Sequence, residues 1–278
     1  MVFFPNCKIN LGLKILRRRD DGYHDLETVF YPLPVRDILE AVRSTSLQFS
    51  ASGRPVPGDP DTNLAIRAYQ LLKKDFPDLP PVRIHLHKQI PIGAGLGGGS
   101  SDGAFMLKLL DREFQLGLDP DRLLIYGALL GSDCPFFLLN QPCIAEGRGE
   151  RLYPLQLDLS AYSILLVHPG IHISTARAFS LCRPDDSGPS LRTVIARPIG
   201  AWRDALVNDF ETPVFQEYPV LRQIKEALYE RGALYAALSG SGSSLFGIFE
   251  TGKAGSGGLE DGWGWGEGIE VISIMGKK

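Results

Sequence analysis

Apolar residues recur at every second position in two short segments of the first half of the chain. Residues 7–16 (CKINLGLKIL) and 82–90 (VRIHLHKQI) both alternate in this way, which predicts half-buried strands. The polar face of residues 82–90 favours an antiparallel sheet, because the strands of a parallel dinucleotide-binding sheet are buried on both faces and apolar throughout. A turn over residues 17–25 then leads to another extended segment that begins at Leu26.

Helical spacing of apolar residues separates these strands. In the first half it predicts helices over residues 64–76, 102–114 and 120–130, with N-caps at Thr62 or Asn63 and at Asp119. In the second half it predicts helices over residues 174–182, 199–209 and 215–231. The strands predicted there cover residues 162–170 and 270–275, and two short strands flank the loop at 239–244.

The apolar pattern weakens between Pro154 and Ser160, so we expect a boundary there between a first domain of residues 1–157 and a second of residues 158–278. Mixed strands and helices in this order predict an α+β fold, with one glycine-serine turn in each domain. Residues 251–268 hold eight glycines and two tryptophans, a composition that does not predict a helix.

Composition and charge narrow the class of protein. The chain has 278 residues, of which 44% are hydrophobic and 22% charged, as in a soluble globular protein. A net charge of -3 leaves no basic face for nucleic acid, and no apolar stretch reaches the roughly 18 to 20 residues that span a bilayer. We expect a cytoplasmic protein, a monomer or weak homodimer, that binds small molecules and neither nucleic acid nor a membrane. Four scattered cysteines are expected to be buried free thiols: Cys7, Cys134, Cys143 and Cys182.

Residues 91–104 read PIGAGLGGGSSDGA and contain six glycines. A P-loop would need a lysine where Gly99 stands, so that hypothesis fails. Gly93, Gly95 and Gly98 satisfy the dinucleotide fingerprint, but the alternating strand before them does not suit that fold. The interpretation that remains is an anion-binding loop, because bare main-chain N–H groups followed by a helix N-terminus suit a triphosphate.

Two charged residues outside this loop are candidates for chemistry. Asp133 follows a predicted helix stop, where it can cap the next segment or serve as a catalytic carboxylate. Lys8 lies among apolar residues of the first strand, where an ammonium group needs a carboxylate or phosphate partner unless it is at the strand edge. His85 and His87 have no third ligand in sequence, so we interpret them as a solvated face and expect no dedicated protein metal site.

Three segments together resemble the motifs of the GHMP kinases, the superfamily of galactokinase and of homoserine, mevalonate and phosphomevalonate kinases. They are NCKINLGL (6–13), the loop at 91–104 and LSGSGSSLFG (238–247). Within that superfamily, four further segments are similar to the 4-diphosphocytidyl-2-C-methyl-D-erythritol kinase family: DGYHDLETVF (21–30), GSDCPFF (131–137), AEGRGERL (145–152) and NDFE (208–211). The resemblance runs from about residue 4 to residue 250.

This resemblance implies a fold and an activity. The fold is a two-domain α+β architecture with an N-terminal domain like ribosomal protein S5 domain 2, a ferredoxin-like C-terminal domain and the active site between them. The activity is transfer of a phosphoryl group from ATP, with Mg²⁺, to the 2-hydroxyl group of 4-diphosphocytidyl-2-C-methyl-D-erythritol, a step of the non-mevalonate route to isoprenoid precursors.

The resemblance also implies roles for individual residues. Asp133 matches the catalytic base and Lys8 the lysine beside it. Tyr23 and Phe179 match the aromatic pair that stacks on the cytosine, and His24 matches the residue that hydrogen-bonds its edge. Asn10 and Thr175 match further substrate contacts. The ATP phosphate loop corresponds to Pro91, Ile92, Gly93, Ala94, Gly95, Leu96, Gly97, Gly98, Gly99, Ser100 and Ser101. Apart from the resemblance, Asn63 and Lys88 are candidates for contacts with adenine, because they lie near in sequence to the helix and the loop that would frame the nucleotide.

Other functions stay open on the sequence. A homoserine or mevalonate type of kinase is less consistent with the turn at Tyr23 and His24, because those substrates have no base to stack. A dinucleotide-dependent oxidoreductase rests on the glycine fingerprint alone. A non-catalytic sensor on the same scaffold would be expected to lose Asp133 or Lys8, and both are present.

Overall fold

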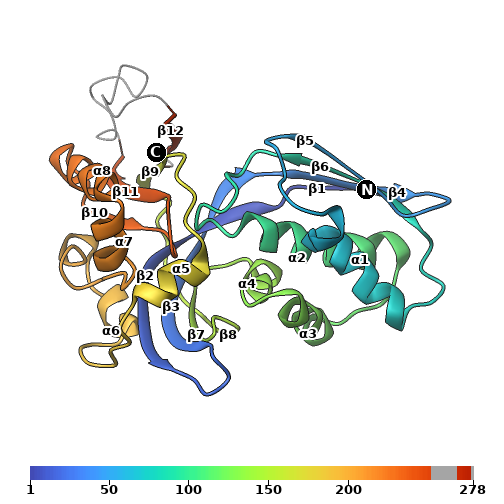
Figure 1. Ribbon diagram of the computed structural model, residues 1–278, viewed down its shortest axis with the longest axis horizontal. Coiled ribbons are helices and arrows are strands. Elements are labelled where there is room, and N and C mark those ends of the chain that lie inside the picture. The colour runs from blue at the N-terminus through green and yellow to red at the C-terminus, as the bar shows by residue number, and fades with distance from the viewer. Residues whose placement is uncertain (252–267, 277–278) are drawn as a thin grey trace. The chain divides into compact units, whose positions relative to one another are not determined.

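The computed structural model describes residues 1–251 and 268–276 (Figure 1). The chain forms two compact units, and each unit is built from several separate stretches of sequence. Unit 1 comprises residues 1–8, 32–92 and 97–141. Unit 2 comprises residues 9–31, 93–96 and the described residues from 142 onward. The boundary predicted near residue 157 stays a prediction, because these units are discontinuous in sequence.

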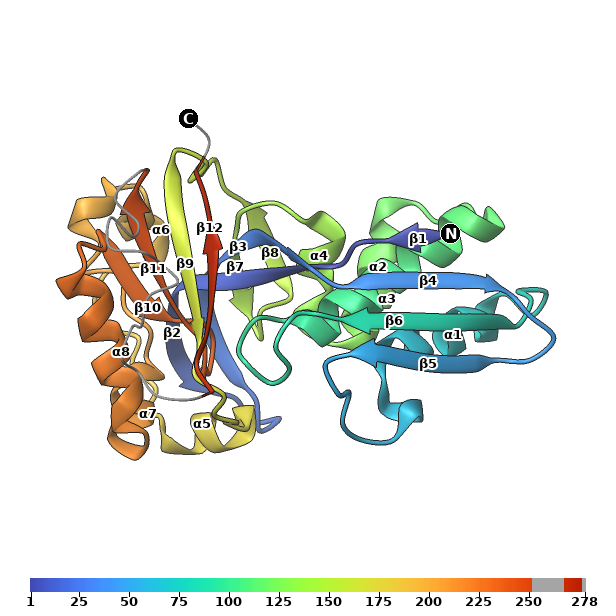
Figure 2. The ribbon, with the colours of Figure 1, turned by 90° about the horizontal axis from the view of Figure 1, so that it is seen from above.

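Unit 1 is a four-stranded sheet with its helices on one face (Figures 1 and 2). The strand order is β1-β4-β6-β5. Helix α2 contacts β1 and β4 of the sheet as well as α1, α3 and α4, so it is the central helix of the unit. The strands are β1 (Val2–Phe3), β4 (Ile38–Arg43), β5 (Gln48–Gly53) and β6 (Val82–Lys88), and the helices are the 3₁₀ turn η1 (Pro60–Thr62), α1 (Leu64–Asp75), α2 (Gly98–Phe114), α3 (Pro120–Leu130) and α4 (Cys134–Leu139).

Unit 2 contains two more four-stranded sheets. The first has the order β2-β3-β7-β8 and the second the order β10-β11-β9-β12. Helix α8 packs on β10 and β11, and the core there includes Leu228, Phe210 and Leu245. The strands are β2 (Asn6–Arg18), β3 (His24–Arg36), β7 (Cys143–Gly147), β8 (Arg151–Pro154), β9 (Tyr162–His168), β10 (Tyr235–Leu238), β11 (Leu245–Glu250) and β12 (Glu270–Ile274), and the helices are α5 (Thr175–Leu181), α6 (Leu191–Ile195), the 3₁₀ turn η2 (Ile199–Ala201), α7 (Glu211–Glu217) and α8 (Pro219–Glu230).

Strand β2 is longer and more deeply buried than its alternating pattern predicts. Residues 6–15 are all buried, so the prediction of a half-buried strand is wrong. The polar residues of this stretch have polar partners that offset the cost of burial. The Asn10 amide donates to Thr28 Oγ1 at 2.8 Å, and Lys14 Nζ donates to the Ser187 carbonyl at 2.7 Å.

Strand β6 alternates between buried and more exposed residues as predicted, but its pairing is mixed. It runs antiparallel to β4 and parallel to β5. The expectation of an antiparallel sheet is therefore correct for one neighbour only. A mixed sheet with helices on one face still differs from the doubly wound parallel sheet of a dinucleotide-binding domain.

The predicted helices differ from the observed ones in three places. Helix α2 starts at Gly98, four residues earlier than predicted. Gly98 and Gly99 adopt a helical backbone although glycine has a low helix propensity. The predicted helix at 199–209 is wrong, since only the turn η2 forms there before the chain becomes irregular around the buried Trp202. The predicted helix at 215–231 is two helices, because Pro219 starts α8 afresh.

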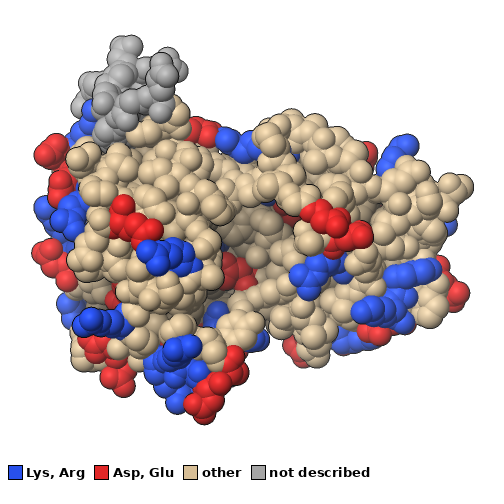
Figure 3. All heavy atoms as spheres, viewed as in Figure 1, with Lys and Arg blue, Asp and Glu red and all other residues tan. Residues whose placement is uncertain are grey.

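Other predictions are confirmed. Helices α1, α3 and α5, strands β9 and β12 and the hairpin β10-β11 all lie where expected. The four cysteines are free as expected, but only Cys7, Cys134 and Cys143 are buried, and the expectation of burial is wrong for the partly exposed Cys182. No helix of the described residues is long and apolar enough to cross a membrane. Most of the glycine-rich segment 251–268 lies outside the described residues. On the face drawn in Figure 3, basic and acidic side chains are interspersed.

Candidate active site

Lys8 and Asp133 meet within unit 1. Lys8 comes from the start of β2, and its side chain is almost completely buried. Asp133 precedes α4, whose first proline fixes the helix start, and its side chain makes no capping hydrogen bond. The Lys8 Nζ and Asp133 Oδ2 atoms are 3.6 Å apart, and the Asp133 side chain is 33% exposed. The carboxylate is thus paired with the lysine and open to an incoming molecule, whereas capping is not its role.

Burial dominates the electrostatics of this pair. Loss of solvent lowers the pKa of Lys8 below its ordinary value of 10.5, and the charge of Asp133 offsets only part of this effect. A second negative charge beside Lys8 would favour the ammonium form and offset this effect of burial, because charges interact more strongly where water is excluded.

The glycine loop approaches this pair at Gly97. A Cβ atom at Gly97 would lie 2.8 Å from Phe137 and 3.2 Å from Lys8 Cε, and the residue has a φ of +70°. Glycine is therefore required both by the backbone conformation and by the close approach. Helix α2 begins directly after it, and its first main-chain bond is from Ser101 N to the Gly97 carbonyl at 2.9 Å. The preceding amide groups, of Gly98, Gly99 and Ser100, are the free donors of the first turn.

A buried ionic cluster supports the first turn of α2. Lys88 Nζ lies 2.5 Å from Asp37 Oδ2 and 2.7 Å from Asp102 Oδ2. Asp37 also accepts the main-chain N–H groups of Gln89 and Ile90, at 2.6 Å and 2.9 Å. Lys88, a candidate for adenine contact, is thus already bound to two carboxylates, so this cluster gives no support to that role. The other candidate, Asn63, caps α1 by accepting from Ala65 N at 2.9 Å.

In unit 2 the second glycine-serine turn clasps residues 93–96 of the loop. Ser239 Oγ donates to the Gly95 carbonyl at 2.9 Å, and Ser244 N donates to the Ala94 carbonyl at 3.2 Å. A Cβ atom at Gly95 would lie 1.9 Å from the Ser239 carbonyl oxygen. Asn10 N donates to Ser239 Oγ at 3.3 Å. The segments that resemble the three kinase motifs therefore contact one another here.

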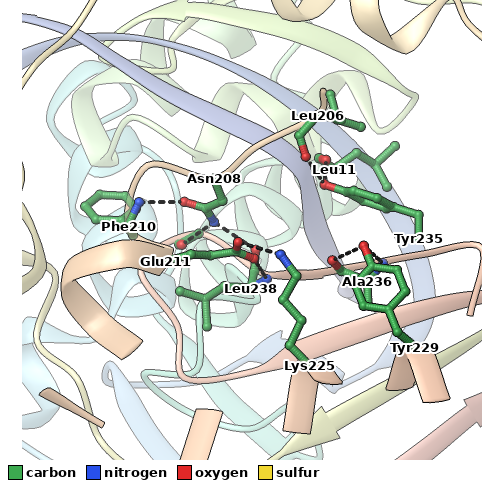
Figure 4. A network of polar contacts seen from close by, with 11 residues as sticks. Leu11, Leu206, Asn208, Phe210, Glu211, Lys225, Tyr229, Tyr235, Ala236 and Leu238 are labelled. Carbon is green, nitrogen blue, oxygen red and sulfur yellow. Dashed lines mark hydrogen bonds and ion pairs between the residues drawn. The ribbon is translucent and has the colours of Figure 1, made fainter. Parts of the chain in front are cut away.

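The segment NDFE (208–211) is hydrogen-bonded to the main chain at the start of the same turn (Figure 4). Asn208 Nδ2 donates to the carbonyls of Leu238 and Gly240, at 2.8 Å and 2.9 Å. Glu211 accepts from Leu238 N at 2.9 Å and is paired with Lys225 at 2.6 Å. The segment NDFE therefore fixes the main chain at the start of the glycine-serine turn.

The residues matched to cytosine binding also come together in unit 2. The rings of His24 and Phe179 are stacked, with centroids 4.9 Å apart and planes at 13°. Burial and then the charge of Arg18 lower the pKa of His24, so its imidazole is neutral near pH 7 and can both donate and accept. Tyr23 is 54% exposed, and its ring faces the guanidinium group of Arg148. Phe179 thus stacks on His24 and meets Phe210 edge-on, and the sandwich of Tyr23 and Phe179 stays a prediction.

Thr175 lies at the start of α5, close to the glycine-serine turn. Its hydroxyl is 3.3 Å from Ser241 Oγ. Ser243 Oγ donates to the Ile171 carbonyl, which ties the turn to the segment that precedes α5. Unit 2 therefore gathers Asn10, Thr175 and the aromatic residues, while unit 1 holds Lys8 and Asp133.

The chain matches two family models. The model described as "GHMP kinases N terminal domain" matches residues 63–141, and the model described as "GHMP kinases C terminal" matches residues 191–257. A 4-diphosphocytidyl-2-C-methyl-D-erythritol kinase of Bacteroides fragilis is 51% identical over 253 residues, which cover 90% of this chain and 92% of that protein. The crystal structure of a 4-(cytidine 5'-diphospho)-2C-methyl-D-erythritol kinase is 33% identical with a TM-score of 0.83, over 100% of both chains. A homoserine kinase from Cytophaga hutchinsonii shares the fold, with a TM-score of 0.71 at 14% identity over 99% of this chain and 93% of that one.

The chain therefore belongs to the GHMP kinases, and it is an ATP-dependent kinase of small molecules with their two-domain α+β fold. Within that superfamily it belongs to the family of 4-diphosphocytidyl-2-C-methyl-D-erythritol kinases. The predicted fold class and enzyme class are confirmed, and the oxidoreductase alternative is wrong.

Several residues of the site cannot be singled out as candidates from the sequence. Ser239 and Ser244 were recognisable only as part of a second glycine-serine loop. Asp102 looked like part of a helix start, and its partner Asp37 lies 65 positions earlier with no local signal. Arg148 lies in a segment that resembles the family, AEGRGERL, but nothing in its spacing points to Tyr23.

Proposed function

We propose that this chain transfers the γ-phosphoryl group of ATP to the 2-hydroxyl group of 4-diphosphocytidyl-2-C-methyl-D-erythritol, in the non-mevalonate synthesis of isoprenoid precursors. The observation that carries the proposal is the Lys8–Asp133 ion pair beside Gly97, at the start of α2. It provides a carboxylate, a buried ammonium group and main-chain donors within one unit. The family membership of the chain supplies the identity of the acceptor.

The reaction needs a proton acceptor and a compensating charge. Asp133 accepts the proton of the 2-hydroxyl group as that oxygen attacks the γ-phosphorus atom, and the bond from this phosphorus to the bridging oxygen of ADP breaks. Lys8 stabilises the negative charge on the attacking oxygen. The acceptor is a tertiary alcohol and a crowded nucleophile, so its positioning contributes to the rate as well as proton removal.

The ATP phosphates are assigned to residues 91–101. The N-terminus of α2 supplies oriented N–H donors and a partial positive charge, both of which favour a polyphosphate. A Cβ atom at Gly99 would meet no atom within 4 Å, so phosphate oxygens can approach the main chain there. A lysine within the loop is then unnecessary, because Lys8 supplies a positive charge from β2.

Mg²⁺ is proposed to enter as part of MgATP, held by the phosphate oxygens. The described residues contain no group of three or more His, Cys, Asp or Glu side chains able to hold a metal ion. Asp102 is a poor ligand because Lys88 Nζ already lies 2.7 Å from it. When bound, the cation would neutralise charge on the β- and γ-phosphates.

Recognition of the acceptor is assigned to unit 2. Cytosine offers a flat aromatic face and an edge of donors and acceptors, which suit Tyr23, Phe179 and a neutral His24. Asn10 and Thr175 are assigned to further polar contacts with the substrate. A cytoplasmic location is part of the proposal, since free thiols such as those of this chain persist in a reducing compartment.

A coupled assay of ATP consumption tests the proposal. The acceptors are the cytidyl substrate, homoserine, mevalonate and galactose, each at the same concentration and with MgATP. We expect turnover with the cytidyl substrate alone, and phosphorus NMR of the product should show a monoester at the 2-position. Turnover confined to one of the other acceptors would refute the proposal.

A further inference from the structure

The turn between β7 and β8 holds Arg148 in a defined position. Gly147 and Gly149 on either side have φ values of +71° and +106°, which L side chains rarely adopt. Gly149 N donates to the Glu146 carbonyl at 3.1 Å, and Arg148 N donates to Glu150 Oε2 at 2.7 Å. The backbone of Arg148 is therefore fixed by hydrogen bonds on both sides of the turn.

The sheet brings this turn to Tyr23. Strands β3 and β7 are antiparallel, with Leu26 opposite Gly147, so the residue after β7 lies beside the first residues of β3, which directly follow Tyr23. The guanidinium carbon of Arg148 lies 4.8 Å from the centroid of the Tyr23 ring. This distance is within the range of a favourable cation–π contact.

The backbone of Tyr23 is fixed as firmly as that of Arg148. Tyr23 N donates to Asp21 Oδ1 at 3.1 Å, and Arg19 N donates to the Tyr23 carbonyl at 2.8 Å. Arg19 also pairs with the Asp21 carboxylate at 2.9 Å. The side chain of Tyr23 is different, because its ring is 54% exposed and has the guanidinium group as its aromatic-face contact.

We propose that Arg148 is a positioning residue that orients the Tyr23 ring to receive the base of the acceptor. The proposal rests on the proposed function, in which Tyr23 stacks on cytosine. A guanidinium group over one face of the ring leaves the other face for the base, so the base can stack in one way only. It also restricts an exposed side chain before binding, which reduces the conformational entropy lost when the substrate binds.

Replacement of Arg148 tests this role. Arg148→Ala should raise the KM for the cytidyl substrate roughly 3- to 10-fold, the scale of ordering one side chain, and leave kcat and the KM for ATP unchanged. Arg148→Lys keeps a cation over the ring and should recover most of the loss, whereas Arg148→Gln should not. A fall in kcat and melting temperature for Arg148→Ala, with no rise in the KM for the cytidyl substrate, would mean a merely structural role and overturn the proposal.

Arg192→Ala is the matched control. Arg192 also covers a tyrosine of unit 2, with its guanidinium carbon 5.4 Å from the Tyr153 ring, but Tyr153 has no assigned role in binding. Its replacement should leave the KM for the cytidyl substrate unchanged. An equal rise in KM for both variants would overturn the proposal, because the effect would then not be specific to Tyr23.

A double-mutant cycle separates the proposal from the function on which it rests. Turnover of the cytidyl substrate by the unchanged protein establishes the activity first. Tyr23→Ala should then raise the KM for that substrate, and adding Arg148→Ala should cause no further rise. A further rise of the same size would show that Arg148 acts independently of Tyr23 and would overturn the proposal. No change in KM for Arg148→Ala, with a clear rise for Tyr23→Ala, would overturn it as well and leave the kinase assignment intact.

Discussion

Lys8 is a buried charged residue, and its proposed role depends on the carboxylate of Asp133 beside it. Its alternating pattern with apolar neighbours allowed either a paired buried ammonium group or a residue at a strand edge. The structure supports the first, because β2 is buried on both faces and Asp133 lies 3.6 Å away. Local sequence could not decide this, since Asp133 is 125 positions further along the chain.

The pH dependence of turnover tests the charge on Lys8. Burial lowers the pKa of Lys8, so the ammonium group loses its proton as the pH rises through a value below 10.5. We expect kcat to fall on the alkaline side before pH 10.5 is reached. Steady-state kinetics between pH 6 and 10.5 measure this, with circular dichroism as the control for unfolding.

Cysteine thiols do not account for such an alkaline fall. Burial raises the pKa of both Cys7 and Cys134 to about 12, above the range of the experiment. A profile of kcat that stays flat up to pH 10.5 would contradict the proposed role of the Lys8 ammonium group.

At the scale of elements, the sequence predicted the strands and helices that have continuous apolar patterns. It did not predict the helix bounds that depend on residues distant in sequence. The helix start at Asp119 and the helix stop at Gly131 are read from local chemistry, whereas the helix break at Pro219 was missed. In contrast, α2 starts directly after Gly97, whose positive φ and close approach to the distant Phe137 have no local signal in the sequence. The missing helix at 199–209 depends on Trp202, which is buried against Tyr235, a residue of β10.

The cluster that supports α2 carries one cation and two carboxylates, so its charges do not balance. Burial raises the pKa of Asp102 to about 7, an effect that Lys88 opposes and Asp37 strengthens. Between pH 4 and pH 7 the carboxyl group of Asp102 is ionised in the unfolded chain but still protonated in the folded one. The free energy of unfolding therefore falls as the pH rises through this window.

Asp102→Asn should remove this dependence, because asparagine resembles the protonated carboxyl group. At pH 7.5 the variant should be more stable than the unchanged protein, by on the order of 1–3 kcal/mol, and the difference should shrink towards pH 4.5. Urea unfolding at the two pH values measures it, with the exposed Asp121→Asn as a matched control. A variant that is less stable at pH 7.5 would contradict the assigned protonation.

Asn208 holds the turn that clasps the glycine loop. Asn208→Ala would leave the carbonyls of Leu238 and Gly240 and the N–H of Phe210 without their buried partner. We expect a loss of about 2–4 kcal/mol in the free energy of unfolding, as for several unsatisfied buried groups. Urea unfolding provides the measurement, and stability equal to that of the unchanged protein would show that water replaces the amide.

At the scale of the whole molecule, the order of motifs along the chain was the informative signal. Three glycine-rich or strand motifs and their spacing resembled the GHMP kinases, and the family models and relatives confirm that class. The division into compact units was not predictable in the same way. The predicted first domain, residues 1–157, is divided between the two units. The divisions after residues 8 and 31 fall inside the long strands β2 and β3, where the sequence pattern is continuous.

The central claim is that Asp133 removes the proton of the acceptor hydroxyl group in this kinase. The measurement is kcat of Asp133→Asn with MgATP and the cytidyl substrate, with the affinities for both ligands measured by calorimetry. We predict a kcat lower by at least about 10²-fold with both affinities retained, while Asp121→Asn, the same change at an exposed position of unit 1, has no effect. A kcat for Asp133→Asn close to that of the unchanged protein would contradict the claim.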